Sequence, residues 1–129
     1  MIKGSCLCGA VSFEIQGPLR SARYCHCTNC RKFSGMSYAA WGLAETSQFT
    51  IAPLVPNVTK FNSGGGLRVF CSACGSPLWY EPAGRPQLRG IPLGAIDEGV
   101  VRPEMHVWTK SKVPWGSISD DLPQFETHP

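Results

Sequence analysis

The seven cysteines constrain this chain more than any other feature of its sequence. They fall into three close groups: Cys6 and Cys8; Cys25, Cys27 and Cys30; and Cys71 and Cys74. An odd number of cysteines cannot all pair in disulfides, and such short spacings are typical of metal ligands. The cysteine pattern therefore predicts metal or thiol chemistry rather than a disulfide framework.

The first and third groups share a glycine directly after the last cysteine, in the stretches CLCG and CSACG. Gly9 and Gly75 can adopt a positive φ without steric cost, so each turn can point backbone N–H groups at the sulfurs. Two such turns supply four thiolates, the number that a closed structural zinc site requires. We therefore predict a structural Zn²⁺ bound by the four-cysteine cluster, which consists of Cys6, Cys8, Cys71 and Cys74.

The middle group differs, because no glycine follows it and Arg31 and Lys32 come next. Three protein ligands and one open position are the pattern of catalytic zinc. Three thiolates and a divalent ion carry a net negative charge, which the two cations could partly offset. We predict a second, catalytic Zn²⁺ at the three-cysteine cluster, which consists of Cys25, Cys27 and Cys30.

Two alternatives stay open for the three-cysteine cluster. A fourth ligand from His26, His106 or His128 would close the site and make it structural; His26 is the weakest candidate, because neighbouring side chains in an extended stretch point to opposite faces. Alternatively, Cys27 and Cys30 could form a redox-active dithiol. That motif usually begins a helix in a βαβ unit, which the sequence does not predict.

Length and composition limit the class of protein. The 129 residues suit one domain spanning 1–129. The N-terminus lacks the apolar core of a signal peptide, and no window approaches the roughly 18 apolar residues of a membrane span, so we expect a cytoplasmic protein. The formal charge of +3 falls to zero if all cysteines are thiolates holding two Zn²⁺ ions, so nucleic-acid binding is not indicated. The sequence does not decide whether the protein forms a homodimer.

Glycine and proline divide the chain into short elements. Strands are expected at 10–15, 37–44, 48–51, 58–62, 67–71, 77–81 and 105–108. In the first, Val11, Phe13 and Ile15 share one face. A turn or two of helix is expected over 28–35, capped by Thr28 or Asn29 and ended by Gly35. The pattern predicts a mainly β fold with at most short helical turns.

The ligand type also limits the chemistry. Thiolate-rich coordination makes zinc a weak activator of water but a good partner for another soft thiolate. The sequence contains neither an HExxH helix motif nor a Gly-x-Ser-x-Gly elbow. Sulfur transfer or thiol addition is therefore favoured over peptide hydrolysis.

Three stretches in this order, GSCLCGAVSFE, CHCTNCRKFSG and FCSACGSPLWY, resemble the glutathione-dependent formaldehyde-activating enzyme family, which also includes centromere protein V. The segment HVWTKSKVPWGSI is similar to the family's closing segment. The resemblance runs from about Gly4 to Phe125. It implies a β-tent fold, in which short, twisted antiparallel sheets surround zinc.

The resemblance implies the same assignment of structural and catalytic zinc to the two clusters. It also implies a carbon–sulfur lyase that acts on thiol–aldehyde adducts, as glutathione forms with formaldehyde, with polar groups near Ser34 to Ser37 orienting the carbonyl. A non-catalytic, zinc-stabilised binding module is the alternative. The basic residues that could hold glutathione are expected to be solvated surface residues; they are Arg31, Lys32, Arg68, Arg85, Arg89, Lys110 and Lys112.

Overall fold

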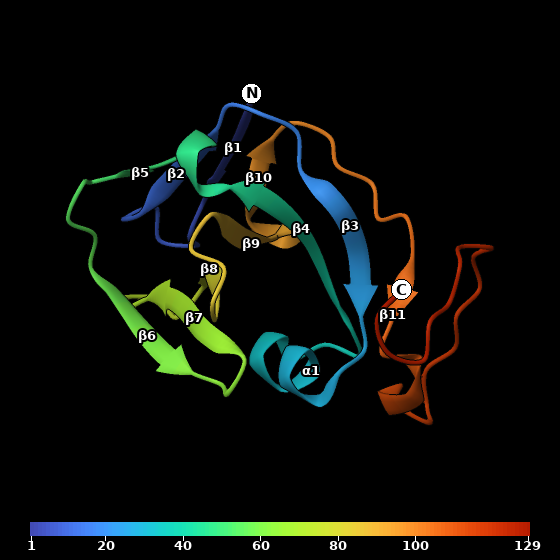
Figure 1. Cartoon of the computed structure of the whole chain (residues 1–129). Helices are drawn as coiled ribbons and strands as arrows, with labels where there is room; N and C mark the ends of the chain where they lie inside the picture. The colour runs from blue at the N-terminus through green and yellow to red at the C-terminus, as the bar shows by residue number, and fades with distance from the viewer.

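The structure, a computed structural model, describes residues 1–129 and is mainly β, as predicted (Figure 1). Its strands are β1 (Ile2–Ser5), β2 (Ser12–Ile15), β3 (Arg20–Cys25), β4 (Ala39–Glu45), β5 (Phe49–Ala52), β6 (Val58–Asn62), β7 (Gly66–Cys71), β8 (Pro77–Pro82), β9 (Leu88–Pro92), β10 (Ile96–Glu98) and β11 (His106–Val107). The helices are α1 (Thr28–Ser34) and the 3₁₀ turns η1 (Thr46–Gln48), η2 (Leu93–Ala95) and η3 (Thr109–Ser111). None of them has the length and apolar character needed to cross a membrane.

The strands form two sheets. The smaller has the order β10-β1-β2-β5, and the larger has the order β11-β3-β4-β9-β8-β7-β6. The strand pairs are antiparallel, as expected, with the exception of β3 and β11, which are parallel. A parallel pair needs a long connection, and β11 follows β3 only after most of the chain has intervened. Figure 1 shows β11 and the C-terminal segment beside β3.

Both sheets contribute to the main hydrophobic core. Val11, Phe13 and Ile15 are fully buried on one face, as the alternation predicts. They pack in one cluster with Val69, Leu78 and Ile91 of the larger sheet. The ring centroids of Phe13 and Phe49 lie 5.6 Å apart, and those of Phe49 and Trp79 lie 5.4 Å apart. Burial of this apolar surface is the main force that holds the two sheets together.

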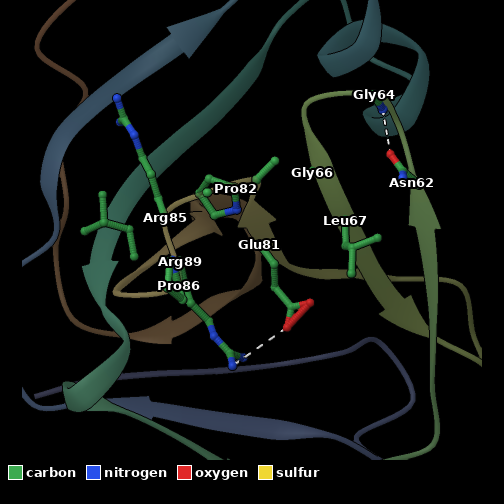
Figure 2. A pocket seen from close by; sticks show the side chains of 12 residues that line it. Asn62, Gly64, Gly66, Leu67, Glu81, Pro82, Arg85, Pro86 and Arg89 are labelled. Atoms are coloured by element: carbon green, nitrogen blue, oxygen red, sulfur yellow. Dashed lines mark hydrogen bonds and ion pairs between the residues drawn. The ribbon is translucent and has the colours of Figure 1, made fainter.

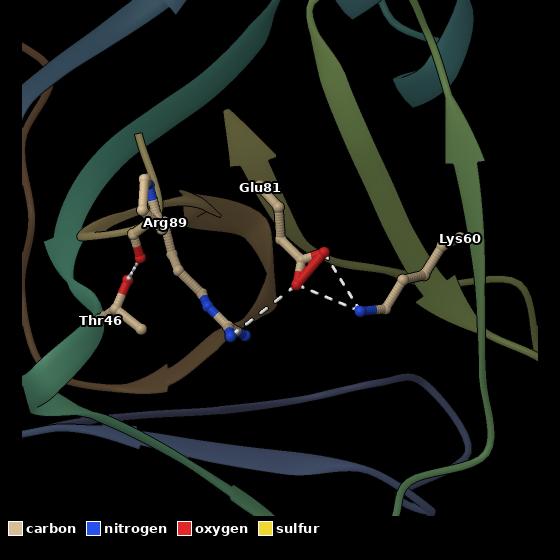
Figure 3. A network of polar contacts seen from close by, with 5 residues as sticks. Thr46, Lys60, Glu81 and Arg89 are labelled. Atoms are coloured by element: carbon tan, nitrogen blue, oxygen red, sulfur yellow. Dashed lines mark hydrogen bonds and ion pairs between the residues drawn. The ribbon is translucent and has the colours of Figure 1, made fainter. Parts of the chain in front are cut away.

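A network of charges spans the larger sheet (Figure 3). Glu81 of β8 pairs with Lys60 of β6 at 3.2 Å and with Arg89 of β9 at 3.8 Å. The Arg89 guanidinium also lies over the rings of Phe49 at 4.9 Å and Trp79 at 5.3 Å. Partly exposed pairs of this kind add little stability individually. They do engage the Glu81 carboxylate on two sides.

Helix α1 begins directly after Cys27. The expected cap at Thr28 or Asn29 is wrong, because both residues lie inside the helix and the Cys27 sulfur accepts a hydrogen bond from the Cys30 N–H at 3.3 Å. Cys27 has the extended backbone that a capping residue requires. Gly35 ends the helix as predicted, with a φ of 72° and its N–H bonded to the Arg31 carbonyl at 2.8 Å.

Four strands were not expected from the sequence: β1, β3, β9 and β10. Strand β3 is interrupted, since its register shifts between Arg20 and Arg23 and Ser21 has a φ of 52°. Strand β1 contains Gly4, where a Cβ would stand 2.2 Å from the Phe13 ring. Glycine thus allows close packing there, but it weakens the strand signal in the sequence.

We predict that Phe13→Ala lowers the free energy of unfolding by about 3–5 kcal/mol, because the ring is 1% exposed inside the core. Phe61→Ala is the matched control, since that ring is 60% exposed on β6 and its removal should change stability by less than about 0.5 kcal/mol. Urea unfolding of both variants measures the difference. Equal losses would contradict the position of the core.

Candidate metal centres

The sulfurs of the four-cysteine cluster all lie within 4.8 Å of one another. The Cys6 and Cys8 sulfurs are 3.6 Å apart, and those of Cys8 and Cys71 are 3.8 Å apart. Tetrahedral zinc with sulfur ligands at about 2.3 Å requires sulfur–sulfur distances of about 3.8 Å. These two distances match those expected around a bound zinc ion.

The two turns that carry these cysteines have similar backbones. Gly9 and Gly75 have φ values of 77° and 78°, as the motif predicts. The Gly9 N–H donates to the Cys6 carbonyl at 3.0 Å, and the Gly75 N–H donates to the Cys71 carbonyl at 2.8 Å. The Val11 N–H also approaches the Cys6 sulfur at 3.4 Å. This last donor, which is directed at sulfur, favours the thiolate form of Cys6 that binds metal.

Ser76 connects the two turns, and sequence reasoning did not identify it. Its hydroxyl accepts a hydrogen bond from the Leu7 N–H at 2.9 Å and lies 3.2 Å from the Cys74 sulfur. The hydrogen bond from Ser76 lowers the pKa of Cys74 to about 5. Its position two residues after Cys74 is the only sequence signal that could have indicated it.

The three-cysteine cluster lies where β3 meets α1. Cys25 ends the strand, Cys27 caps the helix and Cys30 lies in its first turn, which brings the three sulfurs within 4.8 Å of one another. Hydrogen bonds from the Cys25 and Cys30 thiols lower the pKa of Cys27 to about 2, and the contact with Cys27 raises the pKa of Cys25. This cluster could also bind a metal ion.

No histidine joins this cluster. His26 points away from it, as the alternation predicts, and its Nε2 lies 2.9 Å from Nδ1 of His106. His106 is bound in turn to Asp120. Burial, and then the charges of His106 and Lys112, lower the pKa of His26 to about 4, so the ring is neutral at pH 7.

Arg68 is buried, contrary to the expectation from the sequence. It is 6% exposed instead of solvated, and it forms no ion pair with a carboxylate. Its guanidinium lies over the rings of Tyr80 at 5.0 Å and Phe33 at 5.4 Å, and Nε donates to the Ser63 hydroxyl at 3.1 Å. Its positive charge contributes to the lowered pKa of Cys27. The alternation in β7 predicts that Arg68 and Val69 lie on opposite faces of the strand, but it does not show that both faces are covered by other residues.

A pocket of about 430 Å³ opens beside the three-cysteine cluster, with both Cys25 and Cys30 in its wall. Its lining also includes Arg23, Arg68, Arg85, Trp41, Tyr80 and His128. Arg85 forms no ion pair, and its side chain extends away from Glu81, which pairs with Lys60 and Arg89 (Figures 2 and 3). The pocket thus has no carboxylate in its lining and suits an anionic ligand.

The residues expected to orient a carbonyl, Ser34 to Ser37, do not line this pocket. Ser34 and Met36 border a separate pocket of about 580 Å³ with Phe33 and Trp41. A third pocket, of about 420 Å³, lies between β7 and β9 and contains no cysteine (Figure 2).

The chain belongs to the glutathione-dependent formaldehyde-activating enzyme family, whose model matches residues 1–111. A Halomonas elongata protein, whose name assigns it provisionally to these enzymes, is 29% identical over 127 residues, which cover 92% of this chain and 81% of that protein. The fold is similar to a crystal structure of a Rhodobacter sphaeroides protein, with a TM-score of 0.61, 25% identity, and coverage of 76% of this chain and 90% of the other. The resemblance stated from the sequence is thereby confirmed.

We predict that the purified protein contains up to two Zn²⁺ ions per chain, since the cysteines divide into clusters of four and three. The ion at the three-cysteine cluster should leave at lower chelator concentration, because three thiolates hold a metal less tightly than four. Metal analysis during a chelator titration measures both steps. Loss of both ions at one concentration would argue against two different sites.

The two clusters should also differ in their effect on folding. Cys74→Ser should leave the domain poorly folded, because binding energy at a structural zinc site is folding energy. Cys27→Ser should lose metal at the second site and keep a cooperative thermal transition. Calorimetry of both variants tests this, and a Cys27→Ser variant as unfolded as Cys74→Ser would make the second site structural.

Proposed function

We propose that this protein is a zinc-dependent carbon–sulfur lyase that acts on thiol–aldehyde adducts of the glutathione-plus-formaldehyde type. In this proposal residues 1–129 act as one zinc-binding domain, with structural Zn²⁺ at the four-cysteine cluster and catalytic Zn²⁺ at the three-cysteine cluster. Membership of the family supports the reaction class.

One observation carries the proposal: two of the three grouped cysteines, Cys25 and Cys30, line a pocket that is also lined by arginines. No histidine or carboxylate belongs to that group, so the protein offers three ligands and leaves a position for a substrate sulfur. A Zn²⁺ ion bound there supplies stabilisation of a thiolate at neutral pH. The four-cysteine cluster suits the structural role better, because Cys6 and Cys71 belong to the main core.

The arginines would position the thiol. Glutathione carries two carboxylates, and Arg23, Arg68 and Arg85 line the pocket. Arg68 is the strongest candidate, because a buried guanidinium without a carboxylate partner gains from an incoming anion. The Trp41 indole N–H, which is also buried without a partner, is a further donor in this wall.

The reaction needs a proton to move from sulfur to oxygen. The thiol loses its proton, its sulfur forms a bond to the formaldehyde carbon, and the carbonyl oxygen takes up a proton to give the S-hydroxymethyl product. Burial raises the pKa of Tyr80, so its phenol keeps its proton and can donate a hydrogen bond to that oxygen. Holding both reactants in one pocket makes the addition a local event.

We expect the zinc-loaded protein to accelerate exchange between free glutathione plus formaldehyde and their adduct by roughly tenfold or more. Exchange spectroscopy by NMR is the appropriate measurement, because the uncatalysed reaction also reaches equilibrium. Cys25→Ser should return the rate to the buffer value. An unchanged rate for wild-type protein with a panel of cellular thiols would refute the reaction, and the non-catalytic zinc-stabilised binding module would replace it.

Two further variants test the arginine pocket in the same assay. Arg85→Ala should weaken the response to glutathione by about tenfold, as expected for a lost charged hydrogen bond, and should not change the response to neutral 2-mercaptoethanol. Arg102→Ala is the matched control, because Arg102 is exposed and lies outside this pocket. Equal effects on both thiols would remove Arg85 from the site.

A further inference from the structure

A buried chain of hydrogen bonds leads from a surface carboxylate to the tripeptide Cys25-His26-Cys27. Asp120 Oδ2 lies 2.9 Å from Nε2 of His106, and Nδ1 of His106 lies 2.9 Å from Nε2 of His26. Both histidines are only 1% exposed, whereas the Asp120 side chain is 41% exposed. These hydrogen bonds therefore connect the solvent-exposed Asp120 to His26, which lies between two cysteines of the three-cysteine cluster.

The carboxylate determines which nitrogens carry protons along the chain. The hydrogen bond from His106, together with the one from the Leu122 N–H, lowers the pKa of Asp120, so the group is ionised and can only accept. With both rings neutral, His106 therefore donates from Nε2 and accepts at Nδ1, and His26 donates from Nε2. Nδ1 of His26 is then left as a bare acceptor.

The structure provides for that acceptor. Nδ1 of His26 is buried and has no partner within the protein. His26 borders a cavity of about 20 Å³ together with Ser37, Lys112 and Ser117. That volume holds about one water molecule, and all three neighbours can donate hydrogen bonds. These surroundings can therefore satisfy an unprotonated Nδ1.

The two rings are also fixed by their packing. Tyr24 lies 4.9 Å from His106 and Tyr38 lies 4.8 Å from His26, measured between ring centroids. The backbone N–H of His26 donates to the Val107 carbonyl at 3.0 Å, and the backbone N–H of His106 donates to the Pro123 carbonyl at 2.8 Å. The segment that carries Asp120 is therefore tied to β11, and β11 is tied to the cysteine peptide.

We propose that Asp120, His106 and His26 are positioning residues for the metal site at the three-cysteine cluster. Side chains alternate along Cys25-His26-Cys27, so a His26 ring held on one side directs the two neighbouring sulfurs to the other. Asp120 sets the tautomer of both rings and thereby the direction of the side-chain hydrogen bonds that connect it to the tripeptide. The inference rests on the proposed function only in that this cluster binds a metal ion.

The test uses cadmium-loaded protein and three variants. ¹¹³Cd NMR gives a separate signal for each site, with Cys27→Ser identifying the signal of the three-cysteine cluster, and ¹⁵N NMR of the histidine rings reports their tautomers. Asp120→Ala removes the acceptor, Asp120→Asn keeps an acceptor oxygen, and Asp121→Ala is the matched control at an exposed neighbour.

In wild-type protein we expect both rings to be protonated at Nε2. Asp120→Ala should introduce the Nδ1–H tautomer at His26 and shift the cadmium signal of the three-cysteine cluster. The signal of the four-cysteine cluster should stay in place, which also shows that the variant is folded. Asp120→Asn should restore both readouts substantially, and Asp121→Ala should change neither.

Several results would overturn the inference. The first is a His26 ring protonated at Nδ1 in the wild type. The second is unchanged tautomers and cadmium signals in Asp120→Ala. The third is loss of both cadmium signals in Asp120→Ala and in Asp120→Asn, which would make Asp120 a general structural residue. A wild-type protein with a single cadmium signal would instead refute the second metal site of the proposed function. The tautomers, measured in that protein with its single cadmium ion bound, would then decide the role of Asp120 alone.

Discussion

The meeting of two glycine-terminated cysteine turns is the contact on which the rest of this structure depends. Cys6 follows β1 of the smaller sheet, and Cys71 ends β7 of the larger one. Their sulfurs belong to the same buried cluster as Phe13 and Leu78, so the sites of metal binding and of core packing coincide. A metal ion bound there would fix the relative position of the two sheets, and its binding energy would count as folding energy.

Strand β7 extends this constraint to the second cluster. Val69 and Cys71 face the main core, whereas Arg68 on the opposite face lies near the three-cysteine cluster and Phe70 packs against Phe33 of α1. One strand therefore supplies a sulfur to the first site and a positive charge to the second. A buried guanidinium without a carboxylate partner is costly unless other negative charge is near, and the sulfurs of the second cluster provide it.

Much of the site could be predicted from the sequence, because its ligands are close together in the chain. The spacing within each cysteine group, the glycines after Cys8 and Cys74, and the end of α1 at Gly35 all follow from local backbone preferences. The helix cap was missed because a cysteine sulfur took the place of the usual oxygen. The strands β1, β3, β9 and β10 were missed because they are short, charged or contain glycine, and only pairing with neighbouring strands makes them regular.

The sequence by itself determined the number and spacing of the candidate metal ligands, the alternation of Val11, Phe13 and Ile15, and the family. Only the tertiary structure decided that Arg68 is buried, that Arg85 borders the pocket of the three-cysteine cluster, and that Asp120 reaches His26 through His106. The physical reason is distance along the chain. Spacing and backbone preference act over a few residues, whereas these contacts join segments that meet only because of the order of strands in the larger sheet and the parallel pairing of β11 with β3.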